Sequence, residues 1–366
     1  MIISAPAGIT PVGRVADIWL RIEGGIIREI GTDSKTEADL KLSGTLIPAF
    51  VDIHCHGGGG FYFSDPQPAN IARAIELHRN SGTATLFASL VTATPEETTR
   101  QITELKEIFV DEKIAGIHLE GPYLSPQKCG AHEPALLRAP KVSEIQGFLA
   151  AGQGAVSMIT IAPELHGAID AIKFIVSQGV IAAIGHTDSS PDQCAAAIEA
   201  GASVVTHFNN AMNKRKSSPL SAADFLLENS QLPLEVILDG VHLSEDVTAE
   251  LLGKYSDKLI AVTDAMSAAG CADGNFQIGN LNVTVKNQIA RLESNGALAG
   301  STLTMKRVFQ SLIESGVDIN TAVNITSTNA ANLLKNEKIG RIEIGAKAEL
   351  LHFQEGNHIT RVEVGH

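Results

Sequence analysis

Aromatic residues are scarce in this sequence. Phe, Trp and Tyr make up 4% of the 366 residues, with one Trp and three Tyr, whereas the hydrophobic residues as a whole make up 44%. The core must therefore be built mainly from Ala, Val, Ile and Leu. Such residues are typical of buried parallel strands, which read as short continuous aliphatic runs. The composition excludes a disordered or fibrous chain and indicates a globular protein.

Long apolar runs and closely spaced cysteines are also lacking. No stretch reaches the roughly 20 apolar residues that a membrane span needs, and residues 1–12 contain no basic segment followed by an apolar run. The cysteines form no C-x-x-C pair, which favours a reduced, intracellular protein. They are Cys55, Cys129, Cys194 and Cys271. We therefore expect a cytoplasmic protein without a membrane anchor.

Basic residues are in deficit. The formal net charge of −13 argues against nucleic acid as a partner, because phosphate backbones are bound by basic patches. A small anionic substrate is compatible with this charge, since a few local basic groups suffice to hold one phosphate. The one dense basic cluster is Lys214-Arg215-Lys216.

Eight short aliphatic runs lie between residues 46 and 264, and helical patterns separate several of them. The clearest helical patterns cover 69–80, 95–109, 167–178 and 191–200. The aliphatic runs end near Asp52, Ser89, Leu119, Ile161, Ile184, Thr206, Leu238 and Thr263. This alternation predicts a parallel (β/α)8 TIM-type barrel, although a doubly wound open sheet would show the same pattern.

The two ends of the chain fall outside this alternation. Residues 1–45 and 340–366 read as short strands separated by glycine-containing turns. Each end has too little core of its own. We therefore expect the two ends to pair in one small β-sandwich domain beside the barrel, which then spans residues 46–339.

Candidate catalytic residues lie just past the ends of three predicted strands, where a barrel places its active site. Glu120 follows the third aliphatic run, His186 the fifth and His207 the sixth. Two histidines and one carboxylate are a known ligand set for a catalytic metal, and three ligands leave an open position for water. A bound cation lowers the pKa of that water towards about 7. A single strand-end histidine is weak support, and a buried glutamate can instead pair with Arg or Lys.

Two further strand ends carry candidate groups. His54 and His56 follow the first run and project from the same face, where they can share a metal or simply hydrogen-bond in a polar barrel mouth. Asp264 follows the eighth run, where it is either a general base for the metal-bound water or a helix N-cap. His118, next to Glu120, fits a packed core histidine better than a ligand.

Seven motifs in this chain, taken in order, resemble the N-acetylglucosamine-6-phosphate deacetylases of the amidohydrolase superfamily. The likeness covers nearly the whole chain, and although each motif alone is weak, seven in order are specific. The motifs are Pro48-Ala49-Phe50-Val51-Asp52-Ile53-His54-Cys55-His56-Gly57, His118-Leu119-Glu120-Gly121-Pro122, Gly185-His186-Thr187, Thr206-His207-Phe208-Asn209-Asn210-Ala211-Met212, Asp239-Gly240-Val241-His242, Thr263-Asp264-Ala265-Met266 and Leu298-Ala299-Gly300-Ser301.

The resemblance implies hydrolysis of N-acetyl-D-glucosamine 6-phosphate to glucosamine 6-phosphate and acetate in amino-sugar catabolism. Metal-bound hydroxide would attack the amide, with Asp264 as the catalytic acid/base. The matching metal ligands are Glu120, His186 and His207. Family members that retain H-x-H can hold a second metal, so His54 and His56 imply a second site with Glu120 bridging. The implied cofactor is zinc or iron, one or two ions per subunit.

The same resemblance implies the substrate contacts. His132 and His242 match substrate-binding histidines. The family also uses an arginine for the phosphate, often across a dimer interface. Arg215 is our choice, with Lys214 and Lys216 as alternatives, and a shared Arg215 implies a homodimer. The other matching positions are Ala131, Asn210, Ala211, Leu298, Ala299 and Gly300.

Three alternative functions stay open at this point. An N-acetylgalactosamine-6-phosphate deacetylase would act on a substrate that differs at one sugar hydroxyl. A cyclic-amide hydrolase commonly bridges two metals with a modified lysine, and no lysine ends a predicted strand here. A catalytically silent barrel that serves as a binding or assembly protein predicts lost ligands, whereas every metal and acid/base position is filled.

Overall fold

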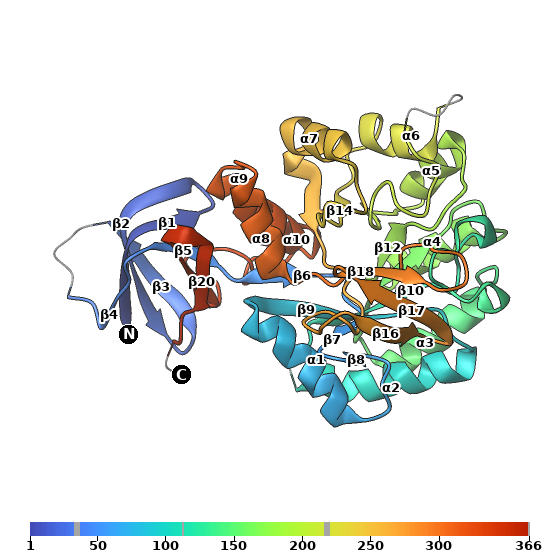
Figure 1. The fold of residues 1–366 in the computed structure, drawn as a ribbon, viewed down its shortest axis with the longest axis horizontal. Helices are drawn as coiled ribbons and strands as arrows, with labels where there is room; N and C mark the ends of the chain where they lie inside the picture. Colours follow the sequence, from blue (N-terminus) through green and yellow to red (C-terminus); the bar gives the residue numbers. More distant parts are fainter. Residues whose placement is uncertain (33–36, 112, 216–219, 365–366) are drawn as a thin grey trace.

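The computed structural model describes residues 1–32, 37–111, 113–215 and 220–364. Figure 1 shows a barrel covered by helices, with a smaller sheet beside it. The predicted (β/α)8 barrel is confirmed, because eight parallel strands are hydrogen-bonded in chain order from β6 to β15. These strands are β6 (Phe50–Asp52), β9 (Thr83–Leu90), β10 (Gly116–Glu120), β11 (Val156–Ile161), β12 (Ile181–Ile184), β13 (Val204–Val205), β14 (Leu234–Val236) and β15 (Leu259–Ala261).

Helices follow the strands and cover the outside of the barrel (Figure 1). The four helical patterns predicted from the sequence match α1, α2, α4 and α5 to within one residue at each end. Among the described residues, no helix is long and apolar enough to cross a membrane. The helices are α1 (Pro68–Asn80), α2 (Pro95–Val110), α3 (Val142–Gly152), α4 (Ala168–Ser177), α5 (Pro191–Glu199), α6 (Ala222–Glu228), α7 (Glu245–Lys254), α8 (Met305–Glu314), α9 (Ile319–Val323) and α10 (Asn329–Leu333).

Side chains of the barrel strands alternate between the helices and the barrel interior. In β15, Ile260 packs in the interior cluster, whereas Leu259 and Ala261 belong to the larger core beneath the helices. The same alternation applies to β10, so His118 and Glu120 point into the barrel. Polar side chains on these interior positions are therefore the ones that can meet at the barrel mouth.

Contacts just past β6 and β15 join the two ends of the strand order. Asp264 N donates a hydrogen bond to His54 O at 2.8 Å. The Thr263 hydroxyl donates to Asp52 Oδ2 at 2.7 Å. These contacts bring candidate site residues from the first and last barrel strands side by side.

The two ends of the chain pair in one sheet, which lies at the left of Figure 1. Its strand order is β20-β19-β5-β1-β2-β3, with β4 paired to β1. β5 extends to Pro48, where it pairs with Leu350 of β19. The expected division into residues 1–45 with 340–366, and 46–339, stays a prediction. The strands are β1 (Ile2–Thr10), β2 (Gly13–Glu23), β3 (Ile26–Gly31), β4 (Leu40–Lys41), β5 (Thr45–Pro48), β19 (Leu350–Gln354) and β20 (His358–Arg361).

A three-stranded antiparallel sheet that we did not predict lies between β15 and α8 in the chain. In its central strand Val283 and Val285 are buried and alternate with exposed residues, as in a sheet with one solvated face. Its buried face packs on Met266 and Ala299, which belong to loops at the barrel mouth. The strands are β16 (Gly274–Ile278), β17 (Leu281–Lys286) and β18 (Ile289–Leu292), and a separate short pair comprises β7 (Gly57–Gly58) and β8 (Phe61–Tyr62).

Candidate metal-dependent active site

Five imidazole rings surround the carboxylate of Glu120 at the end of β10. Glu120 is 3% exposed, and a buried carboxylate without compensating partners is costly. Each ring places its Nε2 atom within 3.5 Å of a Glu120 oxygen. The rings are those of His54, His56, His132, His186 and His207. All but His132 were predicted as metal ligands from the sequence.

Glu120, His186 and His207 form the first group of potential ligands. Glu120 Oε1 lies 3.1 Å from His186 Nε2 and 2.9 Å from His207 Nε2, and the two Nε2 atoms are 3.0 Å apart. Ligands about 2.0–2.1 Å from a tetrahedral zinc ion lie about 3.3 Å from one another. The donor atoms are therefore of the right kind, and close to the right spacing, to hold a divalent cation.

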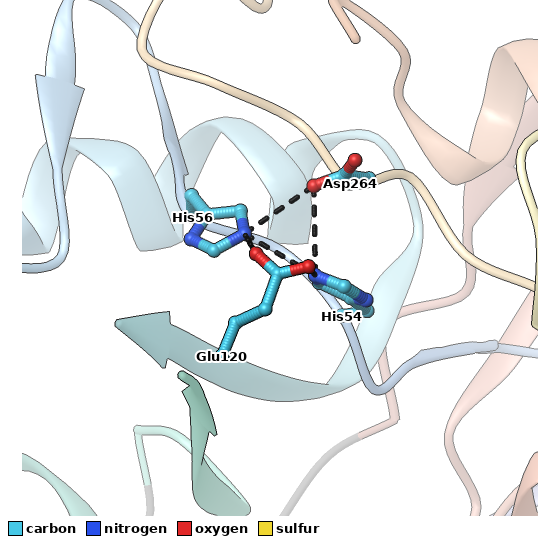
Figure 2. Close-up of side chains that lie close together, drawn as sticks. All are labelled: His54, His56, Glu120 and Asp264. Carbon is cyan, nitrogen blue, oxygen red and sulfur yellow. Dashed lines mark hydrogen bonds and ion pairs between the residues drawn. The ribbon is translucent and has the colours of Figure 1, made fainter. Parts of the chain in front are cut away.

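His54, His56 and Asp264 form a second group beside Glu120 (Figure 2). The two Nε2 atoms are 3.2 Å apart. His56 Nε2 lies 3.0 Å from Glu120 Oε2 and 3.3 Å from Asp264 Oδ1. Glu120 thus contacts both groups, which is the arrangement that a bridging carboxylate requires.

Three of these residues have backbone conformations that are rare outside glycine. The φ angles are 47° at His186, 25° at His207 and 45° at Asp264. Such conformations cost of the order of 1–3 kcal/mol each and tend to occur at functional sites, where the surrounding structure holds them. In each case the unusual φ occurs just past a barrel strand and turns the side chain towards the site.

The outer nitrogens of two ligand rings are fixed by neighbouring oxygens. His186 Nδ1 lies 2.8 Å from the carbonyl oxygen of Lys128. His54 Nδ1 lies 3.0 Å from Glu235 Oε2. An acceptor at Nδ1 keeps the ring proton there and leaves the Nε2 lone pair free for a cation. Both rings are thus oriented for metal binding.

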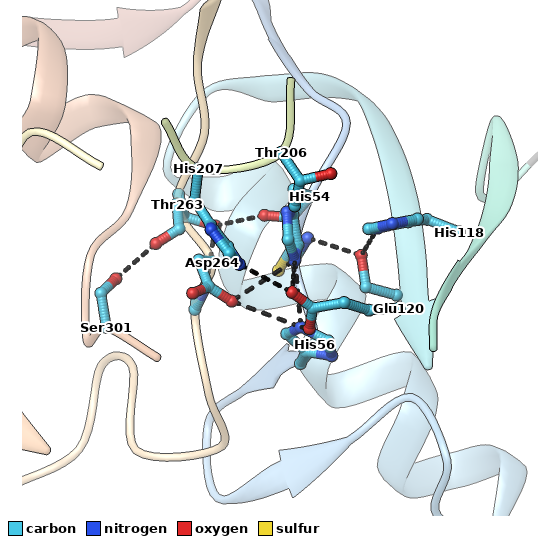
Figure 3. Close-up of polar contacts among 12 residues, drawn as sticks. His54, His56, His118, Glu120, Thr206, His207, Thr263, Asp264 and Ser301 are labelled. Atoms are coloured by element: carbon cyan, nitrogen blue, oxygen red, sulfur yellow. Dashed lines mark hydrogen bonds and ion pairs between the residues drawn. The ribbon is translucent and has the colours of Figure 1, made fainter. Parts of the chain in front are cut away.

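His118 lies beside His54 without joining the ligand groups (Figure 3). The two rings meet edge to face with centroids 4.5 Å apart. His118 Nδ1 is 3.0 Å from Ser89 Oγ, and its Nε2 is 2.8 Å from Thr160 Oγ1. Burial lowers the pKa of His118 well below its usual value. The residue is a neutral, hydrogen-bonded core histidine, the role that we favoured for it.

The carboxylates of the site stay ionised. Burial alone would raise the pKa of Glu120, but the charge of His54 and hydrogen bonds from the neighbouring histidines hold it well below its usual value. Burial also opposes ionisation of Asp264, yet the charge of His54 and a hydrogen bond from His56 lower the pKa of Asp264. Hydrogen bonds that the His56 ring donates to the same carboxylates, together with their charge, outweigh burial and raise the pKa of His56 to about 8. A bound cation would replace the protons on these rings.

His132 lies in the loop after β10 and contacts the same carboxylate. Its Nε2 is 3.3 Å from Glu120 Oε2, and its Nδ1 accepts a hydrogen bond from Thr92 N at 3.3 Å. The ring proton is therefore on Nε2. Burial lowers the pKa of His132 to about 4, so the ring is neutral and faces the site as a hydrogen-bond donor. The preceding residue, Ala131, packs against the three-stranded sheet.

The segment Leu298-Ala299-Gly300 lies between Asp264 and the three-stranded sheet. Ala299 is fully buried, and Leu298 pairs with β18. Gly300 has a φ of 64°, and a Cβ atom there would lie 2.7 Å from the carbonyl oxygen of Asp264. The chain can therefore approach Asp264 this closely only with glycine at position 300.

Asn210 and Ala211 follow His207 in the turn after β13. Asn210 N donates a hydrogen bond to His207 O, and Ala211 O accepts one from Thr187 N, both at 3.0 Å. The turn is thus tied to the residue that follows His186. His242 lies past β14, with its Nδ1 2.7 Å from an oxygen of the neighbouring Asp239 carboxylate. Contacts of these three residues with a substrate stay predictions.

Arg215 is held by carboxylates of its own chain. Its side chain is 6% exposed and forms ion pairs with three acidic residues. A role for Arg215 in phosphate binding stays a prediction and would require some of these ion pairs to open. Lys214 is exposed, and Lys216 lies outside the described residues. The three acidic partners are Asp224, Glu228 and Glu250.

Two supporting groups of the site were not predicted. Glu235 is the one acidic residue in the aliphatic run Leu234–Leu238. An acid in such a run was an available signal, because a carboxylate buried in a strand requires partners. The Lys128 carbonyl carries no such signal, since any residue at that position supplies the same oxygen.

The sequence profile of the amidohydrolase family matches residues 45–363. An N-acetylglucosamine-6-phosphate deacetylase of Bacillus subtilis (strain 168) is 31% identical over 352 residues, covering 91% of this chain and 88% of its own. An N-acetylgalactosamine-6-phosphate deacetylase of Escherichia coli O157:H7 is 30% identical over 366 residues, with coverage of 97% and 95%.

Solved structures give the same result. The crystal structure of N-acetyl-D-glucosamine-6-phosphate deacetylase from Mycobacterium smegmatis is 38% identical, with a TM-score of 0.93 and coverage of 99% of this chain and 97% of that one. A mutant of that enzyme has been solved in complex with N-acetyl-D-glucosamine-6-phosphate. The profile covers most of the chain, and these relatives match it almost end to end. The chain therefore belongs to the amidohydrolase family.

Proposed function

We propose that this protein is a metal-dependent deacetylase that hydrolyses N-acetyl-D-glucosamine 6-phosphate to glucosamine 6-phosphate and acetate in amino-sugar catabolism. The observation that carries the proposal is the position of Asp264. Its Oδ1 lies 3.3 Å from His56 Nε2 and 3.5 Å from His54 Nε2, so an ionised carboxylate stands among candidate metal ligands. The similarity to the Mycobacterium smegmatis deacetylase supports the choice of substrate.

Glu120, His186 and His207 would hold one cation, and His54 and His56 a second, with Glu120 between the two. When bound, a divalent cation supplies the positive charge that polarises the amide carbonyl and makes water acidic enough to attack near neutral pH. Imidazole and carboxylate donors suit both zinc and iron. We therefore propose zinc or iron as the cofactor, with one or two ions per subunit.

Asp264 is the proposed general base and general acid. Because its pKa is lowered, its carboxylate is ionised at neutral pH and can accept a proton from the attacking water at Oδ1. The C–N bond then breaks, and the same oxygen returns the proton to the departing nitrogen. The products are acetate and the free amine, so no other reactant besides water is required.

His132 is the proposed hydrogen-bond donor to the acetamide oxygen. Its neutral ring carries a proton on Nε2, the nitrogen that faces Glu120. Negative charge develops on the carbonyl oxygen as the amide is attacked, and a positioned donor stabilises that charge. Among the other proposed substrate contacts, the segment Leu298–Gly300 lies beside Asp264, and Asn210 and Ala211 lie beside the His186 and His207 turns. His242 is proposed to bind the phosphate end of the sugar.

Arg215 is proposed to bind the phosphate, in a homodimer where it reaches the site of the partner subunit. Binding would exchange its ion pairs with neighbouring carboxylates for a charge-assisted contact to phosphate. Arg215→Ala should then raise KM about 10-fold or more with little change in kcat, whereas Lys214→Ala should leave both unchanged. Sedimentation of the wild-type protein tests the dimer. We also propose a cytoplasmic location, where this sugar phosphate would be found.

The direct test is acetate release by metal-reconstituted protein from N-acetyl-D-glucosamine 6-phosphate and N-acetyl-D-galactosamine 6-phosphate in parallel. The proposal predicts a higher kcat/KM for the gluco substrate. A higher value for the galacto substrate would instead favour the activity named for the Escherichia coli relative. Sugar-phosphate binding without acetate release from either compound would leave a binding protein and refute the deacetylase.

A further inference from the structure

A fully buried glutamate lies directly behind the two ligand groups. Glu235 occupies the middle of β14 and is 0% exposed. Its neighbours Leu234 and Val236 pack in the outer core beneath the helices, so the alternation of a strand directs Glu235 into the barrel. An aliphatic residue would be the less costly choice at such a position. The retained carboxylate therefore requires an explanation beyond packing.

The hydrogen bonds of the Glu235 carboxylate are confined to one of its oxygens and reach both ligand groups. Oε2 lies 3.0 Å from His54 Nδ1 and accepts a hydrogen bond from His207 N at 3.3 Å. Oε1 is buried and has no hydrogen-bond partner within the part of the chain that the structure describes. A single carboxylate oxygen thus links the ring of His54, from the second ligand group, to the backbone of His207, from the first.

Contact with Glu235 determines which nitrogen of His54 can bind a cation. In the neutral, cation-binding ring, a carboxylate at Nδ1 keeps the proton on that nitrogen, so Nε2 retains its lone pair. Nε2 is the atom that faces His56 Nε2 at 3.2 Å and Asp264 Oδ1 at 3.5 Å. The His118 ring packs edge to face against His54, with the ring centroids 4.5 Å apart. Without the carboxylate, the proton could move to Nε2 and block the ligand atom.

The other ligand rings of the described chain are supported differently. His186 Nδ1 contacts a neutral carbonyl oxygen, that of Lys128. The Nδ1 atoms of His56 and His207 have no hydrogen-bond partner among the described residues. Among these four rings, His54 is thus the one held by an anion, which both orients a ligand ring and raises its basicity. The Glu235 carboxylate therefore supports the His54/His56 position, where the second cation would bind.

We propose that Glu235 is a positioning residue that enables the His54/His56 position to hold a cation, by fixing the Nε2 lone pair of His54. The inference rests on the proposed function, because it assumes that both ligand groups bind metal. It adds a residue outside the ligand groups that controls how many ions the site retains. The same residue also ties the two groups together through His207 N.

The test is a titration of metal-stripped protein with Zn²⁺, which measures the affinity for each ion. Elemental analysis then counts the zinc ions bound per chain. Wild-type protein should bind two ions per chain. Glu235→Ala should weaken the second ion about 100-fold and Glu235→Gln about 10-fold, the range typical for loss of a group that supports a metal ligand. The first ion should stay bound in both variants. The visible spectrum of Co²⁺-loaded protein should lose the second ion's contribution in parallel.

Two controls separate this role from a general loss of stability. Glu144→Gln removes a carboxylate that binds Tyr123 and Arg138, away from the ligand groups, and should leave both zinc affinities unchanged. His54→Asn removes the ligand itself and should lose the second ion. Combining Glu235→Ala with His54→Asn should then weaken zinc binding no further, because both changes act on the same position.

Wild-type affinity for both ions in Glu235→Gln would overturn the inference, even if Glu235→Ala fails to fold. Binding of only one ion by the wild-type protein at any Zn²⁺ concentration would also overturn it, whether or not acetate is released. Loss of one ion in the Glu235 variants, together with no acetate release by the two-ion wild type, would support the inference and refute the deacetylase.

Discussion

The carboxylate of Asp52 accepts two hydrogen bonds from Thr263, one from the hydroxyl at 2.7 Å and one from the main-chain N–H at 3.2 Å. These bonds connect the end of the first barrel strand to the end of the last. His54 lies two residues after Asp52, and Asp264 directly follows Thr263. The closure of the barrel therefore sets the distance between a metal ligand and the proposed acid/base.

Thr263→Val should destabilise the protein and loosen the site. The change removes a hydroxyl and leaves one oxygen of the buried Asp52 without its partner, which should lower the free energy of unfolding by about 1–3 kcal/mol. Thr263→Ser keeps the hydroxyl and should lower the free energy of unfolding by less than Thr263→Val does. Urea unfolding of the metal-stripped proteins measures the difference, and equal stability of the Val and Ser variants would contradict this role.

Gly300→Ala should lower kcat/KM by about 100-fold, because the added Cβ would lie 2.7 Å from the Asp264 carbonyl oxygen and small displacements of catalytic groups have effects of that size. Gly296→Ala is the matched control. Gly296 also has a positive φ, 74°, but a Cβ there would meet no atom within 4 Å. Both variants should lose about 1–2 kcal/mol of stability from the left-handed backbone. Steady-state acetate release should separate them, and similar kcat/KM values would refute the close-approach argument.

Removal of the metal should destabilise the protein. A ligand that binds only the folded state, present at 100 times its Kd, stabilises that state by about 2.7 kcal/mol, which corresponds to a Tm shift of roughly 3–4 °C for a chain of this size. Chelator-treated protein should therefore unfold at lower temperature in calorimetry and recover its Tm when Zn²⁺ is added. An unchanged Tm after complete removal of metal would argue against a cation among the five histidines.

Asp318 should stabilise α9 in a pH-dependent way. Its carboxylate accepts hydrogen bonds from Thr321 and Asn320 at the start of the helix, and these bonds lower the pKa of Asp318. A lowered pKa means that the stabilisation is present above the usual pKa of about 4 and is lost as pH falls through the folded-state value. Asp318→Ala should thus cost about 1 kcal/mol at pH 7 and less at pH 3–4. Asp318→Asn retains the cap and should show a smaller and less pH-dependent loss of stability. A stability difference between wild type and Asp318→Ala that does not change with pH would contradict this role.

The barrel and the positions of Glu120, His186 and His207 at its strand ends could be predicted, because both depend on local sequence patterns. Aliphatic runs marked the strands, and a parallel barrel gathers the residues after its strands at one end. Glu120 and His186, 66 residues apart in the chain, contact each other at 3.1 Å for that reason. His118 points to the opposite side of the strand from Leu119, and the core role favoured for it agrees with its contacts with Ser89 and Thr160.

Other features depend on tertiary contacts that no local pattern shows. The ion pair between Arg215 and Glu250 joins a loop to α7 across 35 residues, so the Arg215 guanidinium, which reads from the sequence as free phosphate-binding charge, is paired with carboxylates in the fold. The positive φ angles at His186, His207 and Asp264 arise from what surrounds these residues. The sheet β16–β18 follows the eighth barrel strand and lies outside the strand–helix alternation that predicts the barrel.

The measurement that tests the central claim most directly is acetate release from N-acetyl-D-glucosamine 6-phosphate by Asp264→Asn and wild-type protein loaded with the same metal. Asn preserves the shape of the side chain but cannot exchange the proton at Oδ1, so metal content and Tm should match those of the wild type. We predict that kcat falls by two to four orders of magnitude, of the order expected for loss of a general acid–base group. Near-wild-type turnover by a metal-replete Asp264→Asn protein would contradict the account.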